Sequence, residues 1–254
     1  MIAPYADPMS PVVLEVAVGD PRDVPGAVEG GADRLHAVVP GPTCGLSPEP
    51  SLVSAICRES DLPVFVLLRL NDSWSTTGGE FARLIGLGED YLACGATGVA
   101  FGFLDADLEI DTETCSMLLG RLSNVPWTFT RAVDSSLDPR RSWRRLLPLP
   151  GLVAVRTAGS PRGMSAGYDD LLATITPENA PLMMPGGGLA AEQVPWLVKA
   201  GVRQLHLGRQ VRPGGSAKAY VDAGYVRSWR SLVDDLPDGR AHARAHDRLE
   251  EGGR

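Results

Sequence analysis

The stretch Gly31-Ala32-Asp33-Arg34-Leu35 decides the fold, because its pattern recurs as Gly95-Ala96-Thr97-Gly98-Val99 and as Gly201-Val202-Arg203-Gln204-Leu205. In each copy a glycine suits the left-handed residue that ends a helix, and the residues after it re-enter a sheet. One such turn means little. Three turns at corresponding places indicate repeated helix-to-strand units and favour a barrel.

Short β-rich runs alternate with helix-length segments on both sides of these turns. We predict strands at Val12–Val18, Arg34–Val38, Val64–Leu70, Gly98–Phe103, Trp127–Arg131, Leu152–Arg156, Pro181–Met184 and Gln204–Leu207. Between them, apolar residues recur at helical spacing, as at Cys115, Leu118, Leu119 and Leu122. Eight strands that are each followed by a helix predict a single α/β domain, a (β/α)₈ TIM barrel.

The rival architecture is an open doubly wound sheet, which usually carries a glycine-rich loop after its first strand. Here the first expected strand runs into Gly19-Asp20-Pro21, which cannot wrap a dinucleotide as a GxGxxG loop does. Helix starts support the barrel: Ser47-Pro48 and Asp138-Pro139 each place a capping side chain before a proline, and Asp111 is a candidate cap for the fourth helix.

The barrel is expected to occupy residues 12–236 as one domain. With 254 residues, 44% of them hydrophobic, the chain has enough material for a large core. Residues 1–11 are expected to form a short arm. Residues 237–254 offer only Leu249 for burial, so we expect a short flexible C-terminal tail.

Composition excludes several classes of function. The net charge of -7 makes nucleic acid a poor partner, because phosphate binding needs a basic face. No run approaches the roughly 18 apolar residues that span a bilayer, and the N-terminus does not resemble a signal peptide. The four cysteines form no CxxC pair, which argues against zinc and a disulfide framework. We therefore expect a cytoplasmic protein without a membrane partner.

Polar residues at the carboxyl ends of the strands are the candidate catalytic residues, because barrel active sites lie there. Glu15, His36 and Arg69 come from the first three strands, and Arg131 and Asp134 come from the end of the fifth. A glutamate in a buried strand is costly unless it is paired, and Arg69 and Arg131 are the candidate partners of Glu15. The alternative is a charge network that only fills the barrel.

Glycines follow the last two strands. Met183-Met184-Pro185-Gly186-Gly187-Gly188 joins the seventh strand to a helix that begins near Ala190, and the eighth strand ends in His206-Leu207-Gly208-Arg209. Barrels often bind phosphate with these two loops through bare backbone N–H groups. We predict that Gly186, Gly187, Gly188, Gly208 and Arg209 bind a small anion. Alternatively, the glycines only make tight turns.

Together these strand ends resemble the CutC copper-homeostasis family. The resembling stretches, in order, are Leu14-Glu15-Val16, Gly30 to Leu35, Gly45-Leu46-Ser47-Pro48, Pro63 to Arg69, Gly98 to Asp111, Thr128 to Asp134, Arg156-Thr157-Ala158-Gly159, Pro185 to Gly188 and Ala200-Gly201-Val202. They span roughly residues 12 to 235. The resemblance implies a (β/α)₈ barrel, a cytoplasmic location, a homo-oligomer and a role in copper homeostasis, with copper as the implied cofactor.

The chain departs from the family pattern at the positions best suited to copper. Ala17 and Val18 stand where the family has a cysteine, His36-Ala37-Val38 replaces a Glu-Leu-Cys run, and Thr130 replaces a histidine. Copper(I) prefers thiolate or thioether ligands and can also use imidazole. We therefore assign no metal ligand, and Cys44 is the one thiol expected near the barrel mouth.

Two functions stay open, beside a third option, a scaffold or regulator that has lost catalysis. The first is a CutC-like role in copper homeostasis. The second is a barrel enzyme of isomerase or lyase type, or its inactive descendant, that binds a small phosphorylated or carboxylate ligand at the C-terminal face. In that case Arg69 and Arg131 would neutralise the ligand, and Glu15 or Asp134 would act as acid or base.

Overall fold

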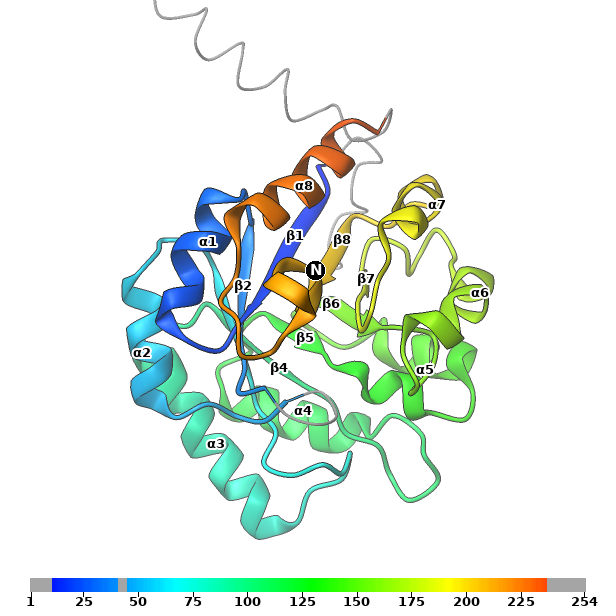
Figure 1. Cartoon of the computed structure of the whole chain (residues 1–254). Coiled ribbons are helices and arrows are strands. Elements are labelled where there is room, and N and C mark those ends of the chain that lie inside the picture. Colours follow the sequence, from blue (N-terminus) through cyan, green and yellow to red (C-terminus); the bar gives the residue numbers. More distant parts are fainter. Residues whose placement is uncertain (1–10, 41–44, 237–254) are drawn as a thin grey trace, which may run out of the picture.

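A computed structural model describes residues 11–40 and 45–236, which form a ring of eight parallel strands with helices around it (Figure 1). The strands are β1 (Val13–Val18), β2 (Arg34–Ala37), β3 (Val64–Leu67), β4 (Gly98–Phe101), β5 (Trp127–Phe129), β6 (Leu152–Thr157), β7 (Met183–Pro185) and β8 (Gln204–Leu207). This confirms the predicted (β/α)₈ barrel. Residues 1–10 of the expected arm, Cys44 and the expected tail lie outside the described residues.

Each strand is followed by a helix. The helices are α1 (Val24–Glu29), α2 (Pro50–Arg58), α3 (Gly78–Ala93), α4 (Thr112–Arg121), α5 (Pro139–Leu146), α6 (Met164–Thr174), α7 (Val194–Lys199) and α8 (Ala223–Asp234). Short 3-10 turns add η1 (Pro21–Asp23), η2 (Arg131–Ser135), η3 (Ala191–Gln193), η4 (Arg209–Val211) and η5 (Pro213–Gly215). In the described part of the chain, none of these helices is long and apolar enough to cross a bilayer.

Two of the three predicted helix caps are confirmed. Asp138 caps α5 ahead of Pro139, and Asp111 caps α4. The prediction for Ser47 is wrong, because α2 begins at Pro50 with Glu49 at its cap position. The Ser47 hydroxyl instead accepts a hydrogen bond from the Arg69 backbone N–H at 2.8 Å, which ties this loop to the residues after β3.

The strands run in the order β7-β6-β5-β4-β3-β2-β1-β8, and β7 lies against β8 so that the barrel is nearly closed. Gln204 spans this last seam. Its side-chain amide donates to the carbonyls of Val153 at 2.8 Å and Pro181 at 2.9 Å, and its oxygen accepts from Arg34 at 3.0 Å. One side chain of β8 thus binds β6, the segment before β7, and β2.

Several strands are shorter at their carboxyl ends than predicted. β3, β4 and β5 end at Leu67, Phe101 and Phe129, so Arg69 lies in the loop beyond β3 and Arg131 is the first residue of η2. The chain after β5 turns at once into η2. β7 begins at Met183, two residues later than predicted, because Asn179 holds the preceding segment in a turn and accepts from the backbone N–H of Met183 at 2.9 Å.

The loop after β6 packs against α6 through two glycines. Gly159 has a φ of 73°, and a Cβ built on Gly167 would lie 2.2 Å from the Ala158 carbonyl oxygen and 2.4 Å from the Ser160 nitrogen. Both neighbours are backbone atoms that cannot rotate away. The β6 loop, which borders the barrel mouth, is therefore held by a contact that only glycine allows.

We expect Gly167→Ala to lower the free energy of unfolding by about 2 kcal/mol or more, because the added methyl group overlaps backbone. Gly86→Ala is the matched control. It also lies inside a helix, α3, and its added Cβ would meet no atom within 4 Å. Without a clash, the helix preference for alanine should raise stability by roughly 0.5–1 kcal/mol. Urea denaturation measures both, and equal effects of the two variants would contradict the close-contact explanation.

Candidate functional site

A cavity of about 600 Å³ opens at the carboxyl ends of the strands. Its described lining includes His36, His206, the glycines Gly187, Gly188 and Gly208, and six arginines: Arg69, Arg131, Arg156, Arg162, Arg209 and Arg212. No aspartate or glutamate occurs among the described lining residues. Although the net charge of the chain is -7, positive charge is therefore concentrated around this cavity.

The floor of the cavity rests on Glu15, whose side chain is fully buried. One carboxylate oxygen lies 2.7 Å from Nη2 of Arg156 and 2.8 Å from Nδ1 of His206, and the other lies 2.8 Å from Nε of Arg34. Arg156 also reaches Nε2 of His36 at 3.1 Å. Four strands thus meet at one carboxylate.

The expected partners of Glu15 were wrong. Neither Arg69 nor Arg131 contacts it, and the network instead uses Arg34, Arg156 and His206. The strand register explains this: Glu15 of β1 pairs with Arg34 on β2 and with His206 on β8, so the three side chains share one face. Sequence reasoning saw Arg156 only as a polar strand end and overlooked Arg34, because register is not visible in sequence.

The contacts around Glu15 determine the protonation states of Glu15, His206 and His36. Burial alone would raise the pKa of Glu15, but the guanidinium groups of Arg34 and Arg156 outweigh it and hold that pKa well below its usual value. Burial, together with the positive charge of Arg156, lowers the pKa of His206 to about 4. The same two causes lower the pKa of His36 well below its usual value. At neutral pH the carboxylate is charged and both imidazoles are neutral.

Hydrogen bonding also fixes which ring nitrogen carries the proton. Arg156 can only donate, so Nε2 of His36 accepts and Nδ1 carries the hydrogen. That Nδ1 is buried and has no hydrogen-bond partner within the described residues. In His206 the arrangement is reversed: Nδ1 donates to Glu15, so Nε2 is the unprotonated nitrogen. The rings lie edge to face with centroids 5.6 Å apart.

Arg131 and Asp134 join the segment after β5 to the end of β6 and the loop that follows it. Arg131 donates to Asp134 at 2.7 Å and to the Ser160 carbonyl at 2.8 Å. Asp134 accepts from the Thr157 hydroxyl at 2.6 Å and from the backbone of Ala158, and burial raises its pKa against the lowering effect of Arg131. With every oxygen engaged, Asp134 is suited to orienting Arg131 rather than to contacting a ligand.

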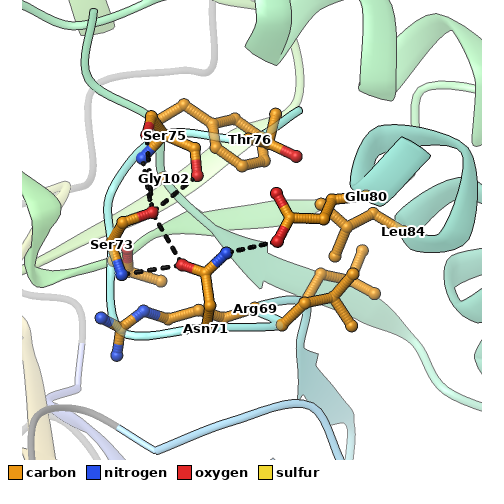
Figure 2. Close-up of a pocket in the computed structure, with 12 residues that line it drawn as sticks. Arg69, Asn71, Ser73, Ser75, Thr76, Glu80, Leu84 and Gly102 are labelled. Carbon is orange, nitrogen blue, oxygen red and sulfur yellow. Dashed lines mark hydrogen bonds between the residues drawn. The ribbon is translucent and has the colours of Figure 1, made fainter. Parts of the chain in front are cut away.

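Arg69 forms the opposite wall. Its guanidinium lies 4.2 Å over the ring centroid of Trp74 and donates to the Gly45 carbonyl at 3.3 Å. Beyond it, Asn71 donates to Glu80 at 2.6 Å and orders the loop that leads into α3. Figure 2 shows the Arg69 guanidinium turned away from the Glu80 carboxylate. The positive charge of Arg69 is therefore presented to the barrel mouth, where Arg69 lines the cavity.

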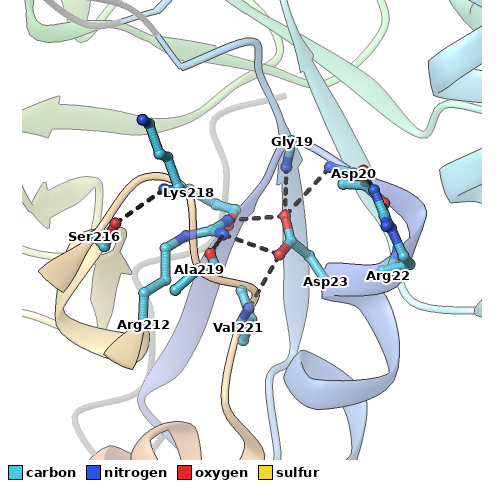
Figure 3. Close-up of polar contacts among 10 residues, drawn as sticks. Gly19, Asp20, Arg22, Asp23, Arg212, Ser216, Lys218, Ala219 and Val221 are labelled. Atoms are coloured by element: carbon cyan, nitrogen blue, oxygen red, sulfur yellow. Dashed lines mark hydrogen bonds and ion pairs between the residues drawn. The ribbon is translucent and has the colours of Figure 1, made fainter. Parts of the chain in front are cut away.

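Sequence reasoning missed a clamp that holds the loop after β8. Arg212 makes two contacts with Asp23, at 2.9 and 2.8 Å, and also donates to the Ala17 carbonyl at 3.1 Å. Figure 3 shows Asp23 at the centre, where it also accepts from the backbone of Gly19 and Val221. The clamp fixes the segment that brings Ala217 to the cavity. An aspartate and an arginine 189 positions apart in the sequence gave no signal of this pairing.

The predicted glycines lie where expected, after β7 and β8. Gly187 and Gly188 have φ values of 76° and 98°, and a Cβ on Gly188 would meet nothing within 4 Å. Gly187 packs against Arg131, where a Cβ would lie 2.7 Å from Nη1. Gly186 does not line the cavity and instead packs on the His206 ring. On the rim, the side chains of Arg162 and Arg209 form no ion pair with any described residue.

The described lining does not fit copper. It contains neither cysteine nor methionine, and no group of three or more His, Cys, Asp or Glu side chains in the described part of the chain is placed to hold a metal ion. Arg156 engages Nε2 of His36, so the described lining offers one imidazole nitrogen, Nε2 of His206. Arginines around the cavity also repel a cation. Cys44, the thiol singled out in the sequence, lies outside the described residues.

Fold and site together define a (β/α)₈ barrel with an arginine-lined cavity at the carboxyl ends of its strands. The CutC family model matches residues 12–211, and the chain belongs to the CutC family. A relative from Klebsiella pneumoniae (strain 342), named family protein CutC, is 27% identical over 209 residues, which cover 78% of this chain and 84% of the relative.

Two solved structures confirm the fold. The putative copper homeostasis protein CutC from Streptococcus agalactiae has a TM-score of 0.69 at 20% identity, covering 78% of this chain and 98% of that one. Thiamine phosphate pyrophosphorylase from Pyrococcus furiosus has a TM-score of 0.58 at 16% identity, covering 91% of this chain and all of that one, 100%. At such identities the likeness concerns architecture alone.

The neutral histidines predict how stability depends on pH. On unfolding, their pKa values return to about 6.5, so between about pH 6.5 and about pH 4 the unfolded chain binds more protons than the folded chain. The free energy of unfolding should therefore fall as the pH falls through this window. His206→Gln should flatten the slope by roughly 1 kcal/mol per pH unit.

Urea denaturation of both proteins at several pH values across this window measures the slope. Glu15 does not confound the result, because a carboxyl with a lowered pKa loses its stabilising effect only below the usual carboxyl range. Parallel curves for wild type and His206→Gln would contradict the assignment of a neutral, buried His206.

Proposed function

We propose that this CutC-family protein binds a small phosphorylated or carboxylate molecule in the cavity at the barrel mouth. The observation that carries the proposal is the lining: six arginines and no carboxylate among its described residues. Arg131 and Arg212 are tied to Asp134 and Asp23, which fixes their orientation. Arg162 and Arg209 have no ion-pair partner among the described residues and are available for a ligand.

The loops after β7 and β8 suit the anionic end of such a molecule. Gly187, Gly188 and Gly208 line the cavity and have no side chain to keep a ligand from their backbone N–H groups. Arg209 lies directly after Gly208, and Arg131 packs on Gly187. Barrel proteins often bind phosphate with these two loops. A cavity of about 600 Å³ also leaves room for the rest of a metabolite beyond its anionic group.

A role in copper homeostasis, which the names of relatives suggest, finds no support in the described lining, because the lining carries cationic arginines and neither cysteine nor methionine. Chemistry of isomerase or lyase type is part of our proposal, since the cavity joins cations to neutral imidazoles. A cytoplasmic location and a homo-oligomer stay predictions from the family resemblance.

We expect inorganic phosphate to bind in isothermal titration calorimetry. Arg162→Ala and Arg209→Ala should each weaken binding by about tenfold, since each removes a charge-assisted contact. Arg227→Ala is the matched control: it removes an exposed arginine on α8 that pairs with Glu29, away from the cavity, and should leave affinity unchanged. If phosphate does not bind the wild type, or if Arg227→Ala weakens binding as much as the rim variants, the anion proposal fails.

Copper(I) titration against a competing chelator tests the other function. We expect no copper uptake against the chelator, because the described cavity offers one imidazole nitrogen among arginines and no thiolate or thioether. Cys44→Ser is the informative variant, since Cys44 is the one thiol predicted near the mouth. Tight copper binding that is lost in Cys44→Ser would favour metal handling over anion binding.

A further inference from the structure

The floor of the cavity carries a hydrogen-bond acceptor, Nε2 of His206, that no described residue uses. The other ring nitrogen, Nδ1, lies 2.8 Å from the Glu15 carboxylate, which is charged and can only accept, so Nδ1 carries the hydrogen. Nε2 of this neutral ring therefore holds a lone pair. Unlike Nδ1 of His36, it is not among the described polar atoms that are both buried and without a partner, and the His206 side chain is 11% exposed. The lone pair is open to the cavity, which His206 lines.

This acceptor contrasts with the cations around it. The six arginines of the lining are donors only, and they suit the oxygens of an anion. An ionised phosphate or carboxylate offers only acceptors, so it cannot pair with Nε2, and covering that nitrogen without a partner costs free energy. A protonated amine could donate to Nε2, but the arginines repel it. The remaining match is a neutral hydroxyl group on the same ligand.

We propose that His206 recognises a hydroxyl group of the ligand by accepting a hydrogen bond at Nε2. This inference rests on the proposed function and narrows its ligand class to hydroxylated phosphates and carboxylates, such as polyol phosphates, sugar phosphates and hydroxy acids. His206 is then a specificity-determining residue of the cavity, because a site that is built to bind a hydroxyl group discriminates against the analogue that lacks it.

The position of His206 suits a hydroxyl group close to the anionic end of a ligand. A Cβ on Gly186 would lie 3.0 Å from the His206 Cβ, so the loop after β7 begins directly against this residue. The next two residues of that loop, Gly187 and Gly188, line the cavity, and their backbone N–H groups donate to no backbone carbonyl of a described residue. Gly208 follows His206 by two residues, about 7 Å along an extended chain. A ligand anchored at these glycines therefore reaches Nε2 with a hydroxyl group only a few bonds away.

The network around Glu15 keeps Nε2 an acceptor. The charged groups that face the ring are Glu15 on β1, Arg34 on β2 and Arg156 on β6. Burial and the charge of Arg156 lower the pKa of His206 to about 4, so no proton occupies Nε2 at neutral pH. Exchanging the two ring nitrogens would break the hydrogen bond to Glu15. Glu15 does not line the cavity itself and acts through His206 as a positioning residue.

Two phosphate esters test this inference in isothermal titration calorimetry with the full chain. Glycerol 3-phosphate and propyl phosphate share the phosphate and a three-carbon chain, but only the first has free hydroxyl groups. We expect glycerol 3-phosphate to bind about tenfold more tightly to the wild type, the effect of one hydrogen bond. His206→Asn should abolish this preference: its amide nitrogen can replace Nδ1 and donate to Glu15, but no atom replaces Nε2. Arg227→Ala should keep the preference.

Nitrogen NMR of the histidine-labelled wild type gives a readout that needs no substitution. We expect the spectrum to show His206 with its hydrogen on Nδ1, and we expect glycerol 3-phosphate, but not propyl phosphate, to shift the Nε2 signal. An Nε2 signal that both esters leave unchanged would contradict the proposed contact, also in the case that His206→Asn fails to fold.

The affinity for inorganic phosphate, measured on the same samples, separates the possible failures. His206→Asn should still bind inorganic phosphate, which also shows that it folds. If the wild type binds neither inorganic phosphate nor either ester, the proposed function itself fails. If phosphate binds but the wild type does not distinguish the two esters, or if His206→Asn keeps the preference, only the recognition of a hydroxyl group by His206 is overturned.

Discussion

The buried carboxylate of Glu15 is the constraint on which the rest of the site depends. Removing a carboxylate from water costs several kcal/mol unless charged partners and hydrogen bonds compensate. Here the compensation comes from Arg34, Arg156 and His206, which approach within 2.8 Å from three other strands. Because these side chains converge on one point, the positions of Arg156 and of the two histidines that border the cavity follow from Glu15. The charge network inside the barrel thus fixes the side chains at the floor of the cavity.

Arginine suits this arrangement better than lysine. A guanidinium is planar and permanently charged, so Arg156 can hold Glu15 and His36 at once, and Arg131 can join Asp134 to a loop carbonyl while lying against Gly187. Each of these arginines is fixed by contacts outside the cavity and still lines it. Preorganised positive charge binds an anion without the cost of ordering flexible side chains. The rim arginines, Arg162 and Arg209, lack such anchors and can adjust to the size of a ligand.

Local patterns predicted the fold well and the site only in part. The three glycine turns and the eight apolar runs reflect short-range chemistry, so the strands and the glycine loop of Gly187 were found where expected, while Arg69 and Arg131 lie just beyond the strands predicted to contain them. The partners of Glu15 were not, because Arg34 and His206 become its neighbours only through the register of β1 with β2 and β8. The Asp23–Arg212 clamp joins residues 189 positions apart and was missed for the same reason. Contacts set by barrel closure leave no trace in sequence spacing.

A network that only fills the barrel would account for part of this structure but not all of it. A charge network that only fills the barrel gains stability by satisfying every buried polar group. Here Nδ1 of His36 stays without a hydrogen-bond partner among the described residues, and the network ends beneath an open cavity of about 600 Å³ rather than filling it. Such a network also does not explain why arginines line the cavity while the chain as a whole is acidic. An unfilled cavity and gathered positive charge are costly for stability alone, and both follow if the barrel mouth binds an anionic ligand, as we propose.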